Sequence, residues 1–340
     1  MGRFRLSIFS FETLRLKAVP LEWWLSLALG SALLLGVEGA ARYLMRPLGE
    51  YAWAYWDDQA MVKFEWFRAV ASAGSPPEVL VIGDSTGARD FCPKAFTETS
   101  GGLTAFNLAW PANFPFALEA TTLPFLRDNT LKAPRYVVLF QSPAAFVDSA
   151  DVERFEAGIL SSPIARLARG DVWPVDRVAL ARIYRCRHLL VRYWLRGEPP
   201  ITSPTRDGFM PERGTGRTGQ GNDKKPVEVP LSKRRLDVVR KFAQVARERG
   251  TQLIVVVPPV RVRPVPSLFQ KYRRWLENTA GSEMFRVIDC AELPELGEAD
   301  YKDFIHLNER GAERFSAILG RVFADGIATC SPASGPAQGS

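Results

Sequence analysis

Residues 78–90 read EVLVIGDSTGARD, and this stretch decides the fold. Its four apolar residues VLVI are typical of a strand that is buried on both faces of a sheet. Gly83 ends the run, and polar residues follow where a helix would begin. Either Gly83 permits a sharp bend and Asp84 or Ser85 simply caps the helix, or Ser85 is held at the strand end as a nucleophile. The stretch alone does not separate these two interpretations.

Similar apolar runs recur along the chain. They are β-branched or aromatic, do not alternate with polar residues, and occupy residues 104–109, 136–142, 253–258 and 286–289. Helical patterns lie between them, at residues 116–127, 232–249, 267–279 and 308–323. Because strands alternate with helices, the sequence predicts an α/β domain over residues 78–328, with five parallel strands in a three-layer α/β/α arrangement.

Residues 21–45 read LEWWLSLALGSALLLGVEGAARYLM and predict one N-terminal transmembrane helix. Fifteen residues from Trp23 to Val37 carry no charge, and about twenty helical residues cross the hydrocarbon core of a bilayer. Basic residues within 1–20 precede the span, so the positive-inside rule predicts a cytoplasmic N-terminus and an extracytoplasmic body. A cleaved signal peptide and a buried core helix are the alternatives.

Three further segments flank or interrupt the predicted domain. Residues 46–77 form a juxtamembrane segment rich in aromatic residues, which is either an interfacial surface or a helix packed on the domain. Residues 150–230 break the α/β alternation and predict an insertion that acts as a lid or a partner surface. Its basic run at 182–196 favours a solvated face over contact with anionic lipid or polymer. Residues 329–340 predict a disordered tail.

Composition argues against several classes of function. The 340-residue chain carries a net charge of +7, but its basic residues are spread out and no nucleic-acid-reading motif occurs, so no nucleic-acid partner is expected. The four cysteines lie far apart without a C-x-x-C pair, so no metal site is expected, and no cofactor either. The two histidines are His188 and His306, and any imidazole base must be one of them.

A second polar motif, DFIH at residues 303–306, follows the last predicted strand. Sites in open parallel sheets form beyond the carboxyl ends of the strands, so this motif and Ser85 are expected at the same edge. Serine is a weak nucleophile that needs a base, and the base needs an orienting carboxylate. Asp303 can bond one ring nitrogen of His306 and leave the other facing Ser85. His188 lies in an arginine-rich helical pattern, where a surface or packing role is expected.

These motifs resemble those of the SGNH/GDSL hydrolases and their acyltransferase relatives. Gly83-Asp84-Ser85 after the first strand and Asp303-x-x-His306 before the last helix carry the resemblance, which covers about residues 78–325. It implies a flavodoxin-like fold. It also implies that Ser85 is the nucleophile, that His306 is the general base and acid, and that Asp303 orients the histidine.

The middle of the chain departs from the family pattern. Family members usually carry a glycine after the second strand, whose amide helps to form the oxyanion hole, and Ala112 stands at that place here. After the third strand the run FQSPAAF replaces the family's Gly-x-Asn-Asp, so the asparagine that donates to the oxyanion is missing. Beside the amides of Ser85 and Ala112, the candidate replacement donors are Asn113, Gln141 and Ser142.

With its predicted anchor, the chain looks more like the membrane-anchored envelope members of the family. That likeness implies a serine-dependent esterase or O-acyltransferase acting on cell-envelope polysaccharide esters through an acyl-serine intermediate. It also implies a periplasmic domain on the bacterial inner membrane, an acylated glycan as substrate and a multi-span membrane acyltransferase as partner. The alternatives are a catalytically decayed scaffold or binding subunit of an envelope acylation complex, and a lipid-active esterase.

Overall fold

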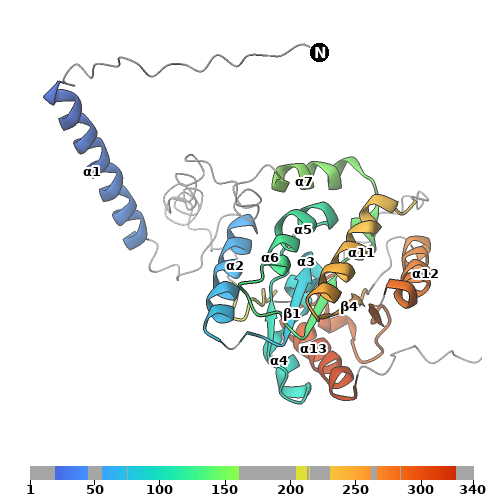
Figure 1. Cartoon of the computed structure of the whole chain (residues 1–340). Helices are drawn as coiled ribbons and strands as arrows, with labels where there is room; N and C mark the ends of the chain where they lie inside the picture. Colours follow the sequence, from blue (N-terminus) through green and yellow to red (C-terminus); the bar gives the residue numbers. More distant parts are fainter. Residues whose placement is uncertain are drawn as a thin grey trace, which may run out of the picture.

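The structure is a computed structural model (Figure 1). It describes residues 20–44, 56–74, 76–160, 204–212, 214, 230–261, 266–283 and 285–326. Four predicted features fall wholly or mostly outside these residues. They are the cytoplasmic segment apart from Pro20, much of the aromatic start of the juxtamembrane segment, most of the insertion with its basic run 182–196, and the tail at 329–340.

Five parallel strands form one sheet. They are β1 (Val79–Gly83), β2 (Ala105–Asn107), β3 (Tyr136–Phe140), β4 (Gln252–Val257) and β5 (Arg286–Asp289). Their spatial order is β2-β1-β3-β4-β5, which is the order of flavodoxin-like sheets. The register pairs Gly83 with Phe140 and Val257 with Asp289, so these strands end along one border, the carboxyl edge. The structure confirms all five predicted strands, with ends within two residues of the expected positions.

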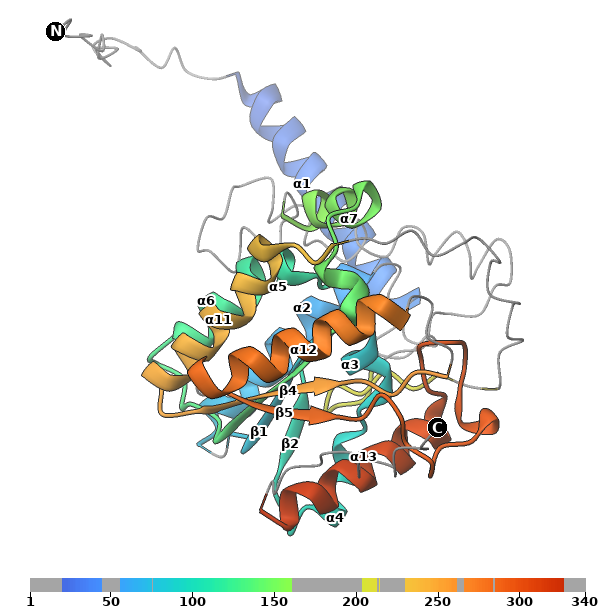
Figure 2. The same ribbon diagram turned by 90° about the vertical axis from the view of Figure 1, so that its right-hand side faces the viewer.

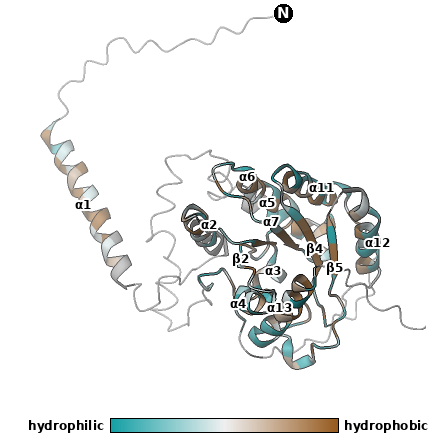
Figure 3. Cartoon of the chain, turned by 60° about the horizontal axis from the view of Figure 1, so that its bottom comes forward, coloured by the Kyte–Doolittle hydropathy of each residue, from teal (hydrophilic) through white to brown (hydrophobic). Residues whose placement is uncertain are grey.

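Helices cover both faces of the sheet and complete three layers (Figure 2). One face carries α2 (Trp56–Ser72), α5 (Pro115–Thr121), α6 (Leu123–Arg127), α11 (Lys233–Glu248) and α12 (Pro266–Glu283). The other carries α3 (Ser85–Asp90), α4 (Pro93–Thr99) and α13 (Glu309–Ala324). The alternation along β1 explains the two cores, because Leu80 and Ile82 face the first set of helices and Val79 and Val81 the second. Figure 3 shows apolar residues on the strands and on the helix sides that face them.

The predicted anchor segment is helical. Helix α1 (Leu21–Leu44) stands apart from the sheet and its covering helices (Figure 1), and its leucines from 21 to 35 are exposed, with Leu29 and Leu35 each at 74%. Among the helices that the structure describes, none is both long and apolar enough to cross a bilayer. A helix over most of residues 21–45 is therefore confirmed, whereas a transmembrane placement stays a prediction.

Helix α2 shows that part of the juxtamembrane segment belongs to the domain. Phe67 is buried, and its ring centroid lies 5.6 Å from that of Phe106 and 5.3 Å from that of Phe125. Phe64 and Trp66 pack against the same core. The packed-helix interpretation therefore holds for residues 56–72, and the domain begins before residue 78. The aromatic pattern could not show this, because membrane interfaces and protein cores both favour such residues.

The start of the insertion is also fixed to the domain. Helix α7 (Ala150–Leu160) carries Glu156, whose Oε2 accepts a 2.7 Å hydrogen bond from the fully buried guanidinium of Arg235 on α11. The same guanidinium donates to Asp148 at 3.0 Å. Glu156 Oε1 accepts the amide of Phe116 at 2.9 Å, so this ion pair joins α7, α11 and α5. A short 3₁₀ turn, η2 (Pro143–Phe146), precedes α7.

Position 83, the last residue of β1, has no room for a side chain. Its φ is +135°, and a Cβ at this position would lie 1.7 Å from the carbonyl oxygen of Phe140. The close approach lets the amide of Asp84 donate to that oxygen at 3.1 Å. The glycine therefore allows β1 to stay paired with β3 up to the point where the chain turns into α3.

Gly83→Ala is expected to lower the free energy of unfolding by about 3 kcal/mol or more. Overpacking against a neighbouring atom costs about 1–3 kcal/mol, and a disfavoured backbone conformation adds about 1–3 kcal/mol. Urea unfolding followed by circular dichroism measures the change. Gly281→Ala in α12, where an added Cβ meets nothing within 4 Å, is the matched control and should be neutral or stabilising by up to about 1 kcal/mol. Equal stability of the two variants would contradict this account of Gly83.

Candidate active site

The first feature of the site is the turn from β1 into α3, which Asp84 organises. Asp84 is the N-cap of α3, and its Oδ1 accepts hydrogen bonds from the amide of Thr86 at 2.9 Å and its hydroxyl at 2.7 Å. Its Oδ2 accepts the amide of Ser142, beyond β3, at 2.9 Å. Burial raises the pKa of Asp84, and these hydrogen bonds oppose the rise. Because Asp84 does the capping, the hydroxyl of Ser85 is left for other contacts.

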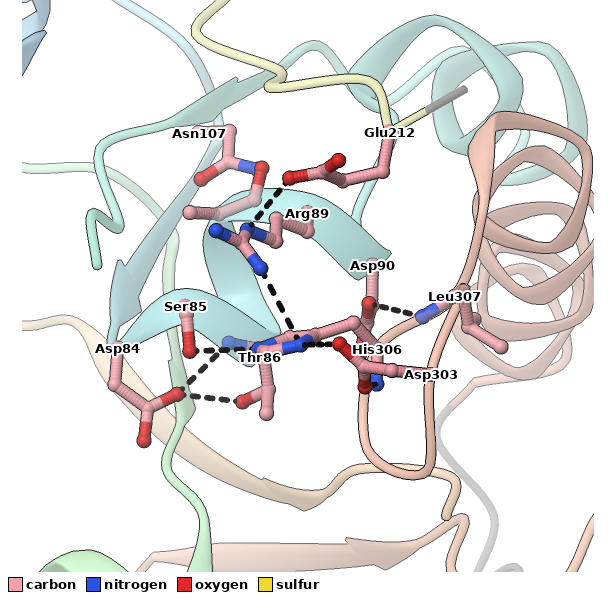
Figure 4. A network of polar contacts seen from close by, with 11 residues as sticks. Asp84, Ser85, Thr86, Arg89, Asp90, Asn107, Glu212, Asp303, His306 and Leu307 are labelled. Carbon is pink, nitrogen blue, oxygen red and sulfur yellow. Dashed lines mark hydrogen bonds and ion pairs between the residues drawn. The ribbon is translucent and has the colours of Figure 1, made fainter. Parts of the chain in front are cut away.

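Ser85, His306 and Asp303 form one hydrogen-bonded line at the carboxyl edge (Figure 4). His306 Nε2 lies 2.8 Å from Ser85 Oγ, and His306 Nδ1 lies 2.8 Å from Asp303 Oδ2. Ser85 is partly exposed, whereas His306 is buried. The structure thus brings together the three predicted catalytic residues, although 221 positions separate the serine from the histidine.

The loop around Asp303 fixes the direction of these hydrogen bonds. Asp303 Oδ1 accepts the amides of Ile305 at 2.9 Å and of His306 at 2.8 Å. Burial raises the pKa of Asp303, but the hydrogen bonds and charge of His306, together with these amides, outweigh it and lower the pKa to about 2. Asp303 is therefore an anion at neutral pH and can only accept. Nδ1 of His306 must donate to it, which leaves Nε2 to accept the hydroxyl proton of Ser85.

Two backbone amides on the segments that meet at the end of β1, those of Ser85 and Ala112, are candidates to bind an oxyanion. Ala112 has a φ of +60° and is the one described residue other than glycine with a positive φ. This left-handed conformation suits the glycine that relatives of the resembled family carry at this place. In the part of the chain that the structure describes, neither the amide of Ala112 nor that of Ser85 has a hydrogen-bond acceptor.

The predicted replacement donors differ in what they already bind. The amide of Ser142 is committed to Asp84, and Gln141 Nε2 donates to the main-chain oxygen of Asn113 at 2.9 Å. The side chain of Asn113 is fully buried, and neither Nδ2 nor Oδ1 has a partner among the described residues. Asn113 is therefore the candidate that keeps a free, buried donor.

The loop after β2 brings Ala112 and Asn113 to the end of β1. The amide of Trp110 donates to the carbonyl oxygen of Gly83 at 3.2 Å, and the amide of Asn113 donates to Trp110 at 3.3 Å. The indole nitrogen of Trp110 is also buried without a partner among the described residues. Buried polar groups are nearly always hydrogen-bonded, so the donors Trp110 Nε1 and Asn113 Nδ2 are available to a water or a substrate oxygen.

Asn107 and Asp90 support the site and were not predicted from the sequence. Asn107 is buried at the end of β2, and its Nδ2 donates to the carbonyls of Gly87 and Phe91, both at 2.8 Å, which clamps α3. Asp90 Oδ1 accepts the amide of Leu307 at 2.8 Å and so ties α3 to the residue after His306. Burial raises the pKa of Asp90 well above its usual value. A polar residue inside an apolar run, as Asn107 is within residues 104–109, was the available signal.

Lys63 of α2 was also missed. It is fully buried, its Nζ donates to the carbonyl oxygen of Ala109, and burial lowers the pKa of Lys63 well below its usual value. The lysine thus connects α2 to the loop that carries Ala112 and Asn113. Nothing in the sequence distinguishes this lysine from those expected on an exposed helix face.

Side chains suited to metal binding do not gather in the described residues. No group of three or more histidine, cysteine or acidic side chains there is arranged to hold an ion. Cys92 and Cys290 are buried and are not joined in a disulfide, and Cys186 and Cys330 lie outside the described residues.

Comparisons with known proteins did not assign this chain to a family. A scan against protein-family models and a search of curated proteins both found no match. The likeness to the SGNH/GDSL hydrolases therefore depends on the two sequence motifs, the strand order and the geometry around Ser85.

Proposed function

We propose that this chain is a serine-dependent esterase or O-acyltransferase of the SGNH/GDSL type. The observation that carries the proposal is the unbroken line from Ser85 Oγ through His306 to Asp303, with both contacts at 2.8 Å. Free amides at Ser85 and Ala112 lie on the segments that meet at the same strand end. A nucleophile, an oriented base and oxyanion donors are the groups that acyl transfer requires.

In the proposed reaction, Ser85 Oγ attacks the carbonyl carbon of an ester while His306 Nε2 takes the hydroxyl proton. The carbonyl electron pair moves to oxygen, and the amides of Ser85 and Ala112 with Asn113 Nδ2 bind the resulting oxyanion. Collapse of this intermediate breaks the ester C–O bond, and His306 returns the proton to the leaving alcohol. Asp303 stabilises the imidazolium between these steps.

The acyl-serine is then released by a second attack. Water or a sugar hydroxyl loses its proton to His306 Nε2 and adds to the acyl carbon. The bond between that carbon and Ser85 Oγ then breaks, and His306 returns the proton to Oγ. Water gives hydrolysis, and a sugar hydroxyl gives O-acyl transfer. Both reactions use the same three side chains, so an assay with a glycan acceptor distinguishes them.

This chemistry is proposed to take place at a bacterial cell envelope. The exposed leucines of α1 favour attachment of the chain to the inner membrane, and the basic residues before α1 favour a periplasmic domain. By resemblance, the substrate is an acylated envelope polysaccharide and the partner is a multi-span membrane acyltransferase. The two alternatives are a scaffold subunit without catalysis, which the missing family asparagine favours, and a lipid-active esterase, which a preference for long-chain esters would support.

A fluorophosphonate probe is expected to label the full-length chain at Ser85. Ser85→Ala should abolish labelling, and His306→Ala should slow it by about 10²–10⁴-fold because the general base is lost. His188→Gln removes the other histidine and should label like the wild type. Gel fluorescence measures the rates, and circular dichroism verifies that each variant is folded. A folded wild-type chain that does not label would favour the scaffold alternative.

Asn113→Leu separates an oxyanion donor from a structural residue. Loss of one donor should lower kcat for p-nitrophenyl acetate by about 10²–10³-fold, which corresponds to about 2.7–4 kcal/mol. The free energy of unfolding should stay the same or rise, because two buried polar atoms without partners are removed. Stopped-flow kinetics and urea unfolding give the two numbers. An unchanged kcat would exclude Asn113 as a donor.

A further inference from the structure

One part of the predicted insertion, residues 204–212, crosses the helix that carries the nucleophile. We refer to these residues as the strap. At one end the amide of Asn107 donates to the carbonyl oxygen of Asp207 at 2.8 Å. Next, the amide of Met210 donates to Ala88 on α3 at 3.0 Å. At the other end the amide of Glu309 donates to Glu212 at 2.8 Å. The strap therefore links β2, α3 and α13.

The strap is packed into the domain rather than laid over it. Phe209 and Met210 are buried in the core between the sheet and α3, α4 and α13. Gly208 has a φ of +88°, and a Cβ there would lie 2.0 Å from the carbonyl oxygen of Asn107. This close packing holds the end of the strap in a defined position beside α3.

Glu212, at that end, faces a cation that touches the candidate catalytic histidine (Figure 4). Arg89 Nε lies 3.2 Å from Glu212 Oε1, and Arg89 Nη1 lies 3.3 Å from His306 Nδ1. Because Nε has no well-aligned hydrogen-bond partner, the contact with Glu212 is a charge pair. The Arg89 side chain is 17% exposed, so solvent screens this pair only partly.

The contact between Arg89 and His306 is electrostatic. Nδ1 of the ring already donates its proton to Asp303, so it has no lone pair to accept a second donor. The guanidinium is thus a fixed positive charge beside a ring that becomes positive when Nε2 takes a proton. Such a charge opposes protonation of the ring, and Glu212 partly offsets it.

We propose that Arg89, whose charge Glu212 of the strap partly offsets, opposes protonation of His306 and so favours the form of the ring that accepts the proton of Ser85. This inference rests on the proposed function in that His306 is taken as the base. Arg89 is a positioning residue, since it acts through His306. The segment expected to be a lid or a partner surface thereby contributes a charge to the site.

The charges around His306 set the direction in which each substitution should shift the pKa of the ring. Asp303 faces it from its own loop, Asp84 from the N-cap of α3 and Arg89 from the same helix; Glu212 of the strap lies against Arg89, and the buried Asp90 binds the amide of Leu307 beside the histidine. Removing Arg89 should raise the pKa of His306, whereas removing the charge of Glu212 should lower it. Removing both charges should return the pKa toward that of the wild type.

Nuclear magnetic resonance titration of His306 tests these directions without relying on catalysis. The probe is the full-length chain in detergent micelles with ¹³C-labelled histidine and His188→Gln, so that His306 gives the single histidine signal. Arg89→Met should raise the pKa of His306 by about one unit, and Glu212→Gln should lower it by less. Arg89→Lys keeps the charge and should stay near the wild-type value. Glu313→Gln, an exposed acid that lines the same hollow as Glu212, is the matched control and should cause no shift.

The outcomes separate this inference from the proposed function. In labelling by the fluorophosphonate probe, the acid limb of the pH–rate profile should move in the same direction as each pKa. A purely structural role of Arg89 would slow the reaction without moving that limb. Shifts in the same direction for Arg89→Met and Glu212→Gln, or none in folded variants, would overturn the inference. If the shifts occur but the wild type never labels, the charge arrangement stands and the proposed chemistry fails.

Discussion

The close approach of β1 to β3 at Gly83 is the constraint on which the rest of the site depends. With no side chain at Gly83, the carbonyl of Phe140 accepts the amide of Asp84, and the carboxylate of Asp84 reaches across to Ser142. Two strand ends are thereby joined by one buried acid. The first turn of α3 starts from this junction, so the position of Ser85 follows from backbone contacts rather than from its own side chain.

The second determinant is the placement of two loops and the helix α3 along the same edge. The segment after β5 supplies His306, the segment after β2 supplies Ala112 and Asn113, and α3 supplies Ser85. Asp90 and Asn107 bind α3 to these two neighbouring segments, with hydrogen bonds of 2.8 Å. Burial of such groups is tolerated because most of their polar atoms find partners. The site is therefore rigid in its framework and keeps its few unsatisfied polar atoms in the loop next to the serine.

The sequence predicted the sheet and the triad because both leave local signals. Doubly buried strands read as uninterrupted apolar runs, and a serine and an Asp-x-x-His motif at strand ends must meet at one edge. The packing of α2, the burial of Lys63 and the path of the strap left no such signal. Each depends on contacts between segments far apart in the chain, and a buried lysine or a loop phenylalanine looks the same in sequence as an exposed one. Of the three replacement donors suggested by the sequence, Asn113 stands out because Gln141 and the amide of Ser142 already bind other groups.

The packing of α2 into the domain also limits how far the site can be from α1. Only the eleven residues 45–55 separate the end of α1 from the start of α2, and a fully extended chain of that length reaches at most about 40 Å. If α1 is held at a membrane and the site is catalytic, as proposed, this length keeps the domain within a few nanometres of α1. Under that proposal, the acyl acceptors within reach are polymers or lipids in the layer next to the bilayer, at a high local concentration.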